Sequence, residues 1–282
     1  MSVLTGNPLT KHFRQPAIYI KLPSEGRWYA EGSIDLPVTG EIPIYPMTAK
    51  DELTMKTPDA LLNGASTAHV IESCCPAIKN AWQVPTVDLD AILIAIRIAS
   101  YGKQLDFKSK CPHCGTENEK AIDLSFILDK INPSDWSQTV LFNGLEIMLK
   151  PQSYEDYNKN NVNVYEEQRI LQLVQDQEIS EEEKVKKFDE MFQKLIISGI
   201  KQVTKSIAGI KMDDGTVVTR VDYITEFLNN CDRKLWDLIK DRLEIINKQN
   251  SEHNLVELTC ENPECNQDFT APFMFEQTNF FV

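Results

Sequence analysis

The sequence predicts an α+β fold that is mostly helical, with two cysteine-tipped β-hairpins interrupted by a helical insertion. Two cysteine pairs far apart in the chain each follow an extended segment and occupy a tight turn. Apolar residues recur at helical spacing over much of the remaining sequence. Short segments rich in β-branched and aromatic residues, bounded by Pro and Gly, account for the predicted strands. With 282 residues, the chain is long enough to bury a substantial core.

The pattern divides the chain into three parts. Residues 1–47 have short extended segments and no helical period, and we expect them to form an extended N-terminal arm. Residues 48–150 and 251–282 together would form a core with the two cysteine hairpins, and residues 151–250 a helical insertion.

The N-terminal arm contains two candidate strands. Residues 17–22 read Ala-Ile-Tyr-Ile-Lys-Leu, and residues 41–45, interrupted by Pro43, would form a short edge strand. A segment of this kind can lie across a partner's surface or pack on its own domain, and the sequence leaves both alternatives open.

Helical patterns begin at Thr48, which resembles an N-cap followed by acidic residues suited to the helix dipole. Two short helices are predicted over residues 57–64 and 68–75. The strongest helix follows Pro85 and ends at Gly102. Its apolar residues share one face: Leu89, Ile92, Leu93, Ile96 and Ala99.

The first cysteine pair, Cys111 and Cys114, is separated by Pro112-His113 and followed by Gly115. The second pair, Cys260 and Cys265, is followed by Asn266, which tolerates positive φ. Four thiolates offered by two tight turns match a tetrahedral Cys₄ zinc site. The sequence therefore predicts a split zinc ribbon with a structural Zn²⁺ ion.

Other interpretations of these cysteines are two disulfides or unrelated buried thiols. Residues 1–13 contain no apolar leader segment, which favours a reducing compartment and hence metal over disulfides. About 145 residues separate the two pairs, far more than in an ordinary zinc ribbon, so the intervening segment must be an insertion. His113 and His253 are alternative ligands.

After the first hairpin, residues 123–128 fit either a short helix or a strand. Asn143-Gly144 predicts a hairpin over residues 138–149. The insertion should contain helices over residues 154–175 and 181–203, a hairpin turned at Asp214-Gly215, and two further helices over residues 222–229 and 232–248.

The net charge of −13 lies entirely in residues 111–282, because residues 1–110 are neutral. This sign argues against a nucleic-acid surface, where Lys and Arg must neutralise phosphates. It fits a solvated acidic helical surface or contact with a basic partner. No apolar run approaches the roughly 18 residues of a membrane span.

Motifs for catalysis are missing from the sequence. It has no Gly-rich phosphate loop, no nucleophile elbow and no His-Glu-x-x-His. A four-sulfur zinc is coordinatively closed and leaves no position for an activated water. We therefore expect no enzymatic activity and no small-molecule substrate.

The order of several short segments resembles the T4-type bacteriophage baseplate hub proteins, the group that includes the small hub assembly protein. The resemblance rests on residues 22–26, 46–52, 59–64, 88–90, 96–102 and 111–115. It implies a non-enzymatic structural or assembly role in a contractile tail, with other tail and baseplate proteins as partners. It also implies a location in the host cell cytoplasm during assembly and leaves open whether the protein stays in the virion baseplate.

A second hypothesis is a zinc-ribbon accessory protein associated with nucleic acid or transcription. Lys108, Lys110 and Lys120 supply positive charge near the first hairpin, but the second hairpin is acidic.

Overall fold

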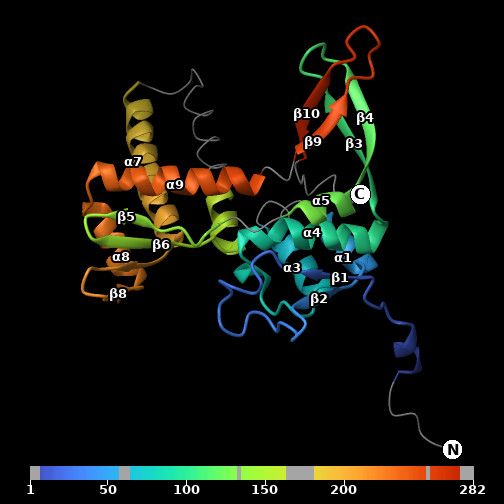
Figure 1. Ribbon diagram of the computed structural model, residues 1–282, viewed down its shortest axis with the longest axis horizontal. Coiled ribbons are helices and arrows are strands. Elements are labelled where there is room, and N and C mark those ends of the chain that lie inside the picture. The colour runs from blue at the N-terminus through green and yellow to red at the C-terminus, as the bar shows by residue number, and fades with distance from the viewer. Residues whose placement is uncertain (1–6, 57–63, 132–134, 163–180, 252–254, 274–282) are drawn as a thin grey trace, which may run out of the picture.

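A computed structural model describes residues 7–56, 64–131, 135–162, 181–251 and 255–273 (Figure 1). Helices and small antiparallel sheets form these regions, which confirms an α+β fold. None of the helices in the described ranges combines the length and apolar composition that a membrane crossing requires.

Helices and short strands are interspersed along the described residues. The first half contains η1 (Pro8–His12), β1 (Ile18–Lys21), β2 (Glu41–Ile44), α1 (Ala49–Met55), α3 (Ala65–Cys74), η2 (Ala81–Gln83), α4 (Thr86–Tyr101), β3 (Gln104–Lys110), β4 (Glu117–Asp123) and α5 (Leu124–Lys130). The second half contains β5 (Val140–Phe142), β6 (Leu145–Leu149), α7 (Glu181–Lys205), β7 (Ile207–Lys211), β8 (Val217–Val218), α8 (Val221–Asn230), α9 (Arg233–Ser251), β9 (Leu255–Thr259) and β10 (Asp268–Pro272). Residues 154–162 are also helical.

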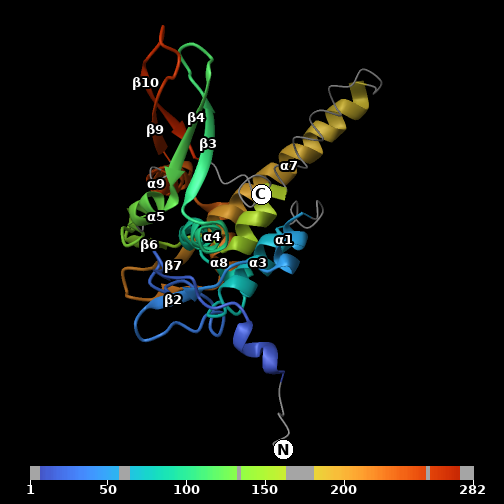
Figure 2. The ribbon, with the colours of Figure 1, turned by 90° about the vertical axis from the view of Figure 1, so that its right-hand side faces the viewer.

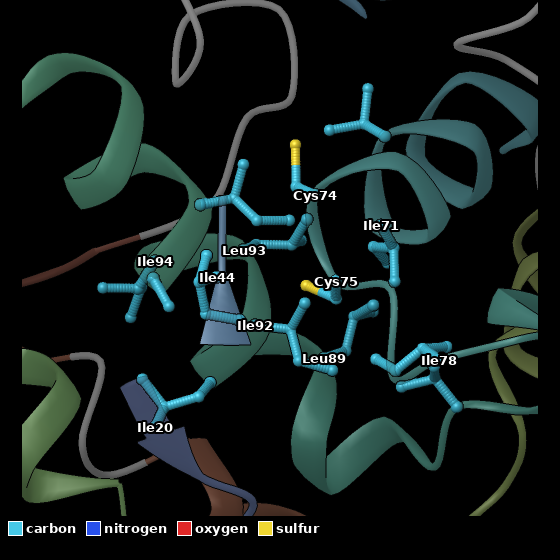
Figure 3. Packing of buried hydrophobic residues seen from close by; sticks show 14 of the residues in the cluster. Ile20, Ile44, Ile71, Cys74, Cys75, Ile78, Leu89, Ile92, Leu93 and Ile94 are labelled. Atoms are coloured by element: carbon cyan, nitrogen blue, oxygen red, sulfur yellow. The ribbon is translucent and has the colours of Figure 1, made fainter. Parts of the chain in front are cut away.

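Helix α4 is the centre of the main core. Every residue from Val87 to Ile98 except Asp90 is buried, so the helix is covered on all sides and not only on the face predicted from its spacing. Strands β1 and β2 and helices α3 and α5 all contact it. Figure 3 shows its side chains packed against Cys74 and Cys75 at the end of α3, and both cysteines are fully buried in the core.

The N-terminal segment packs on the chain's own core. Strands β1 and β2 pair antiparallel, with Ile18 opposite Ile44, and their inward residues Ile20, Ile42 and Ile44 are buried against α4. Arg14, just before β1, donates to the Ser73 carbonyl at 2.7 Å and to the Ser73 hydroxyl at 2.9 Å. Strands β1 and β2 therefore pack on the chain's own domain, whereas Leu9 and Phe13, in and just after η1, are exposed.

The short helices begin where local chemistry places them. Thr48 caps α1 in a capping box with Asp51, as predicted. Helix α3 begins at Ala65, earlier than expected, because Gly64 adopts φ 75° at its N-cap. The helix predicted over residues 57–64 lies almost wholly outside the described residues. The segment after the first hairpin is a helix, α5, and not a strand.

A second core surrounds a four-stranded antiparallel sheet in the order β5-β6-β7-β8. Both predicted hairpin turns are present, with positive φ at Asn143, Gly144 and Gly215. Strand β6 of the expected core pairs with β7 of the expected insertion. The boundary predicted at residue 150 therefore divides a hydrogen-bonded sheet. The end of α7, α8 and α9 pack with this sheet in one apolar cluster.

The long helix α7 is only partly packed. Near its C-terminal end Val203 is buried, whereas the apolar side chains of Val185, Leu195 and Ile196 are exposed. In Figure 2 the N-terminal part of α7 extends away from the other labelled helices and strands.

Candidate metal centre

Two β-hairpins project side by side from the layer formed by α4 and α5 (Figures 1 and 2). In the first, β3 and β4 pair antiparallel from Gln104 opposite Asp123 to Lys110 opposite Glu117. In the second, β9 and β10 pair from Leu255 opposite Pro272 to Thr259 opposite Asp268. Each hairpin is a separate two-stranded sheet, so side chains must hold the two together.

Apolar residues on the inner faces join the hairpins along their length. Leu258, Phe269 and Ala271 are buried, and Phe107 of the first hairpin packs against this cluster. At the base, the Phe107 and Phe273 ring centroids are 5.9 Å apart. The two hairpins are therefore positioned by ordinary hydrophobic packing before any ion is considered.

Each cysteine pair lies in a tight turn closed by backbone hydrogen bonds. In the first turn the Gly115 N–H donates to the Cys111 carbonyl at 2.9 Å, and Gly115 adopts φ 76°. In the second turn the N–H groups of Cys265 and Asn266 both donate to the Asn262 carbonyl, each at 2.9 Å. Asn266 adopts φ 42°. The positive φ expected at Asn266 is confirmed, and Gly115 provides the same conformation in the first turn.

Asn118 links the two turns, and the sequence reasoning missed it. This residue is only 3% exposed. Its Oδ1 accepts the Glu261 N–H at 2.7 Å, and its Nδ2 donates to the Thr116 carbonyl at 2.9 Å. The sequence could have indicated this role, because side chains alternate between the two faces of β4 and this places Asn118 on the same inward face as Ile122. A polar residue at an inward position needs hydrogen-bond partners.

The four predicted ligands converge at the hairpin tips. The sulfur atoms of Cys111, Cys114, Cys260 and Cys265 all lie within 4.8 Å of one another. The Cys111–Cys265 Sγ distance is 3.9 Å and the Cys114–Cys260 Sγ distance is 3.5 Å. A tetrahedral ion with metal–sulfur bonds of about 2.3 Å requires sulfur–sulfur distances of about 3.8 Å. The thiols present therefore fit a tetrahedral metal ion.

The other interpretations of the cysteines fit the structure less well. A disulfide requires a sulfur–sulfur distance of about 2.05 Å, and all seven cysteines are free thiols. Three of them, Cys74, Cys75 and Cys231, lie outside the cluster. His113 is exposed in its turn and is not in the cluster, and His253 lies outside the described residues.

The thiols of the cluster differ in acidity. A hydrogen bond with the Thr116 hydroxyl, 3.3 Å away, and one from the Thr116 backbone lower the pKa of Cys114 to about 6. Burial raises the pKa of Cys260 to about 12. A divalent ion between the sulfurs would offset this difference, since a coordinating thiol is deprotonated outright.

A family model described as T4 bacteriophage base plate protein matches residues 20–282. No curated protein and no solved structure matches the chain. The matched range begins in β1 and includes both cysteine hairpins and all the helices between them. The chain therefore belongs to the T4 bacteriophage base plate protein family.

Proposed function

We propose that the protein is a non-enzymatic structural or assembly component of the hub of a contractile-tail baseplate, built around a structural zinc ion. The observation that carries the zinc proposal is the convergence of four cysteine sulfurs within 4.8 Å of one another. Other phage tail and baseplate proteins would be its partners, and the host cell cytoplasm its location during assembly. Permanent residence in the virion is compatible with this role.

Zinc is the metal that this ligand set favours. Four thiolates in tetrahedral geometry suit Zn²⁺, and a four-sulfur site is closed to water, so it supports structure and not hydrolysis. Structural zinc stabilises isolated fingers by on the order of 10 kcal/mol. In this protein the hairpins already share an apolar face, so we expect zinc to fix their tips and not to determine the whole fold.

The hub assignment rests on the segments that resemble hub proteins, and two pairs of these segments also contact each other in the fold. Ser24, of residues 22–26, donates through its N–H to Asp88, of residues 88–90, at 2.7 Å. The Met47 N–H, of residues 46–52, donates to the Ser100 hydroxyl, of residues 96–102, at 2.9 Å. The shared sequence features thus belong to one framework around α4.

The alternative, a zinc ribbon that binds nucleic acid, has weaker support. Lys108 forms an ion pair with Glu119 at 3.4 Å, which reduces the positive charge of the first hairpin. The Lys120 ammonium group donates to the Glu257 carbonyl at 3.2 Å. Two of the three lysines that favoured this hypothesis are therefore already engaged within the protein.

Metal analysis with matched variants tests the zinc proposal. Protein purified without chelator should contain about one equivalent of zinc per chain, and Cys111→Ser should lose it. The control is Cys231→Ser, at a half-buried cysteine outside the cluster, which should keep its zinc. Limited proteolysis of Cys111→Ser should show new cleavage in both residues 105–120 and residues 255–270. Protein without zinc, or unchanged protection of both hairpins, would contradict a shared ion.

Assembly intermediates from infected cells test the hub role. Disruption of this gene should stop assembly before the baseplate closes around its centre, while peripheral subassemblies accumulate and sediment separately. Complete baseplates formed without the protein would contradict the proposal.

A further inference from the structure

A groove separate from the cysteine cluster opens where three helical segments meet. It has a volume of about 630 Å³ and lies between residues 154–162, α7 and α8. Helices α7 and α8 pack against each other beside it. We call it the lysine groove, after Lys159, Lys194, Lys201 and Lys205, which line it.

The lining of the lysine groove has an excess of positive charge. Among the described residues that line it, these four lysines face a single carboxylate, Asp156. That carboxylate is paired with Lys205 at 3.4 Å. Lys159 is paired with Glu155 of its own helical segment at 2.5 Å. Lys194 and Lys201 therefore supply most of the positive charge. The local charge is thus opposite in sign to the net charge of −13 of the whole chain.

The groove also has apolar surface within reach of the lysines. Ile197 of α7 and Val221 of α8 line it, and each is 52% exposed. Lys194, Ile197, Lys201 and Lys205 are spaced by three, four and four residues, so they form one stripe along α7. Grooves that bind amphipathic helices accept the apolar face of the helix on exposed apolar side chains, and lysines beside them can pair with acidic residues of the same helix.

We infer that the lysine groove binds an acidic amphipathic helical segment of another protein. The volume between three helical segments exceeds what a single inorganic anion needs, and the exposed Ile197 and Val221 match apolar side chains of a partner. The positive lining selects acidic over basic segments and accelerates their association. The statement that the partner is a baseplate protein rests on the proposed function. The preference for an acidic helix rests only on the residues that line the groove.

Two synthetic peptides of about 20 residues, long enough to form a helix, provide the probe. Both peptides have leucines on one face of the helix. The Glu peptide carries Glu at the remaining positions, and the Lys peptide carries Lys there. Fluorescence anisotropy should show binding of the Glu peptide to the full-length protein and none of the Lys peptide. Binding should weaken between about 0.05 and 0.5 M salt, because the contacts are between exposed charges.

A charge-matched pair of variants locates the binding site. Lys194→Glu/Lys201→Glu should weaken binding of the Glu peptide at least tenfold. The control, Lys21→Glu/Lys50→Glu on exposed positions of β1 and α1, changes the net charge equally and should bind as the wild type does. Zinc content and circular dichroism of both variants should be unchanged, so failure of the groove is distinguishable from failure of the zinc centre.

Three outcomes would overturn the inference. The first is equal binding of the Lys peptide, or an equal loss in the control variant. The second is self-association of the wild type that is lost in Lys194→Glu/Lys201→Glu, since the occupant would then be a second copy. The third is poor acylation of Lys194 and Lys201 in peptide-free monomer, because the groove would then be filled by the chain itself.

Discussion

The carboxyl group of Asp88 should make the stability of this protein fall as pH rises. Asp88 lies in the first turn of α4 and is fully buried. It accepts the Ser24 N–H at 2.7 Å and the Ser24 hydroxyl at 2.5 Å. Burial raises its pKa from the ordinary 3.8 to about 6, although the hydrogen bonds from Ser24 act in the opposite direction.

The size and sign of the effect follow from this shift. The pKa rises by roughly 2 units on folding, and each unit corresponds to about 1.4 kcal/mol, which gives about 3 kcal/mol. Between about pH 4 and pH 6 the folded state binds more protons than the unfolded state, so stability decreases with rising pH. Above that window the group is ionised in both states and the loss is complete.

Urea unfolding of the wild type and Asp88→Asn at a series of pH values measures the effect. The variant keeps a carbonyl oxygen that can accept the Ser24 N–H, but it cannot ionise. The free energy of unfolding of the wild type minus that of the variant should fall by about 2 kcal/mol between pH 4 and pH 6.5, because part of the total of about 3 kcal/mol is lost outside this range. Subtraction removes contributions common to both proteins, including that of Asp51. Burial alone would raise the pKa of Asp51, but hydrogen bonds from Thr48 and Ser73 lower it.

Metal content must be measured at each pH, because cysteine ligands release metal as they are protonated. Stabilities of the wild type and the variant are compared only at pH values where both proteins contain the same amount of metal. A difference that stays constant across the window would refute the reasoning, since it would mean that Asp88 ionises in the folded protein as it does in the unfolded chain.

Two further substitutions test positions that the structure singles out. Asn118→Ala leaves the Glu261 N–H without its acceptor, which should cost about 1–3 kcal/mol and speed zinc release to a chromogenic chelator. Asn118→Asp, which keeps an acceptor, should release zinc more slowly than Asn118→Ala; identical rates would exclude this linking role. Gly64→Ala forces a left-handed residue and brings its Cβ to 2.7 Å from the Tyr154 hydroxyl oxygen. Thermal unfolding should show a loss of about 1–3 kcal/mol. Gly32→Ala, at a similar φ of 76° but with open space around the new Cβ, should lose less, and equal losses would show that the contact does not matter.

Features set by local chemistry could be predicted from the sequence. The Asn143-Gly144 turn, the Thr48 cap and the turns around the cysteines depend on residues within a few positions of one another. The convergence of Cys111 and Cys260 could also be predicted, although they are far apart, because each turn offers half of a four-ligand set.

Features set by packing between distant segments could not be predicted. The pairing of β6 with β7 depends on which hairpin edges meet, and no local pattern specifies that. Helix α4 has apolar residues on one face by spacing, yet other elements cover all its sides. Asp88 looks in the sequence like an ordinary acidic residue at a helix start, because its partner Ser24 is 64 residues away.

The face-to-face packing of the hairpins also has a consequence for synthesis of the protein on the ribosome. Strand β4 ends at Asp123 and strand β9 begins at Leu255. The inner surface of the first hairpin therefore stays uncovered until the second hairpin, which is translated much later, has been made. At about 5–20 residues per second, the delay is on the order of ten seconds. Throughout that interval the second hairpin is not yet available to cover Phe107. The nascent chain therefore exposes hydrophobic surface to which a chaperone can bind.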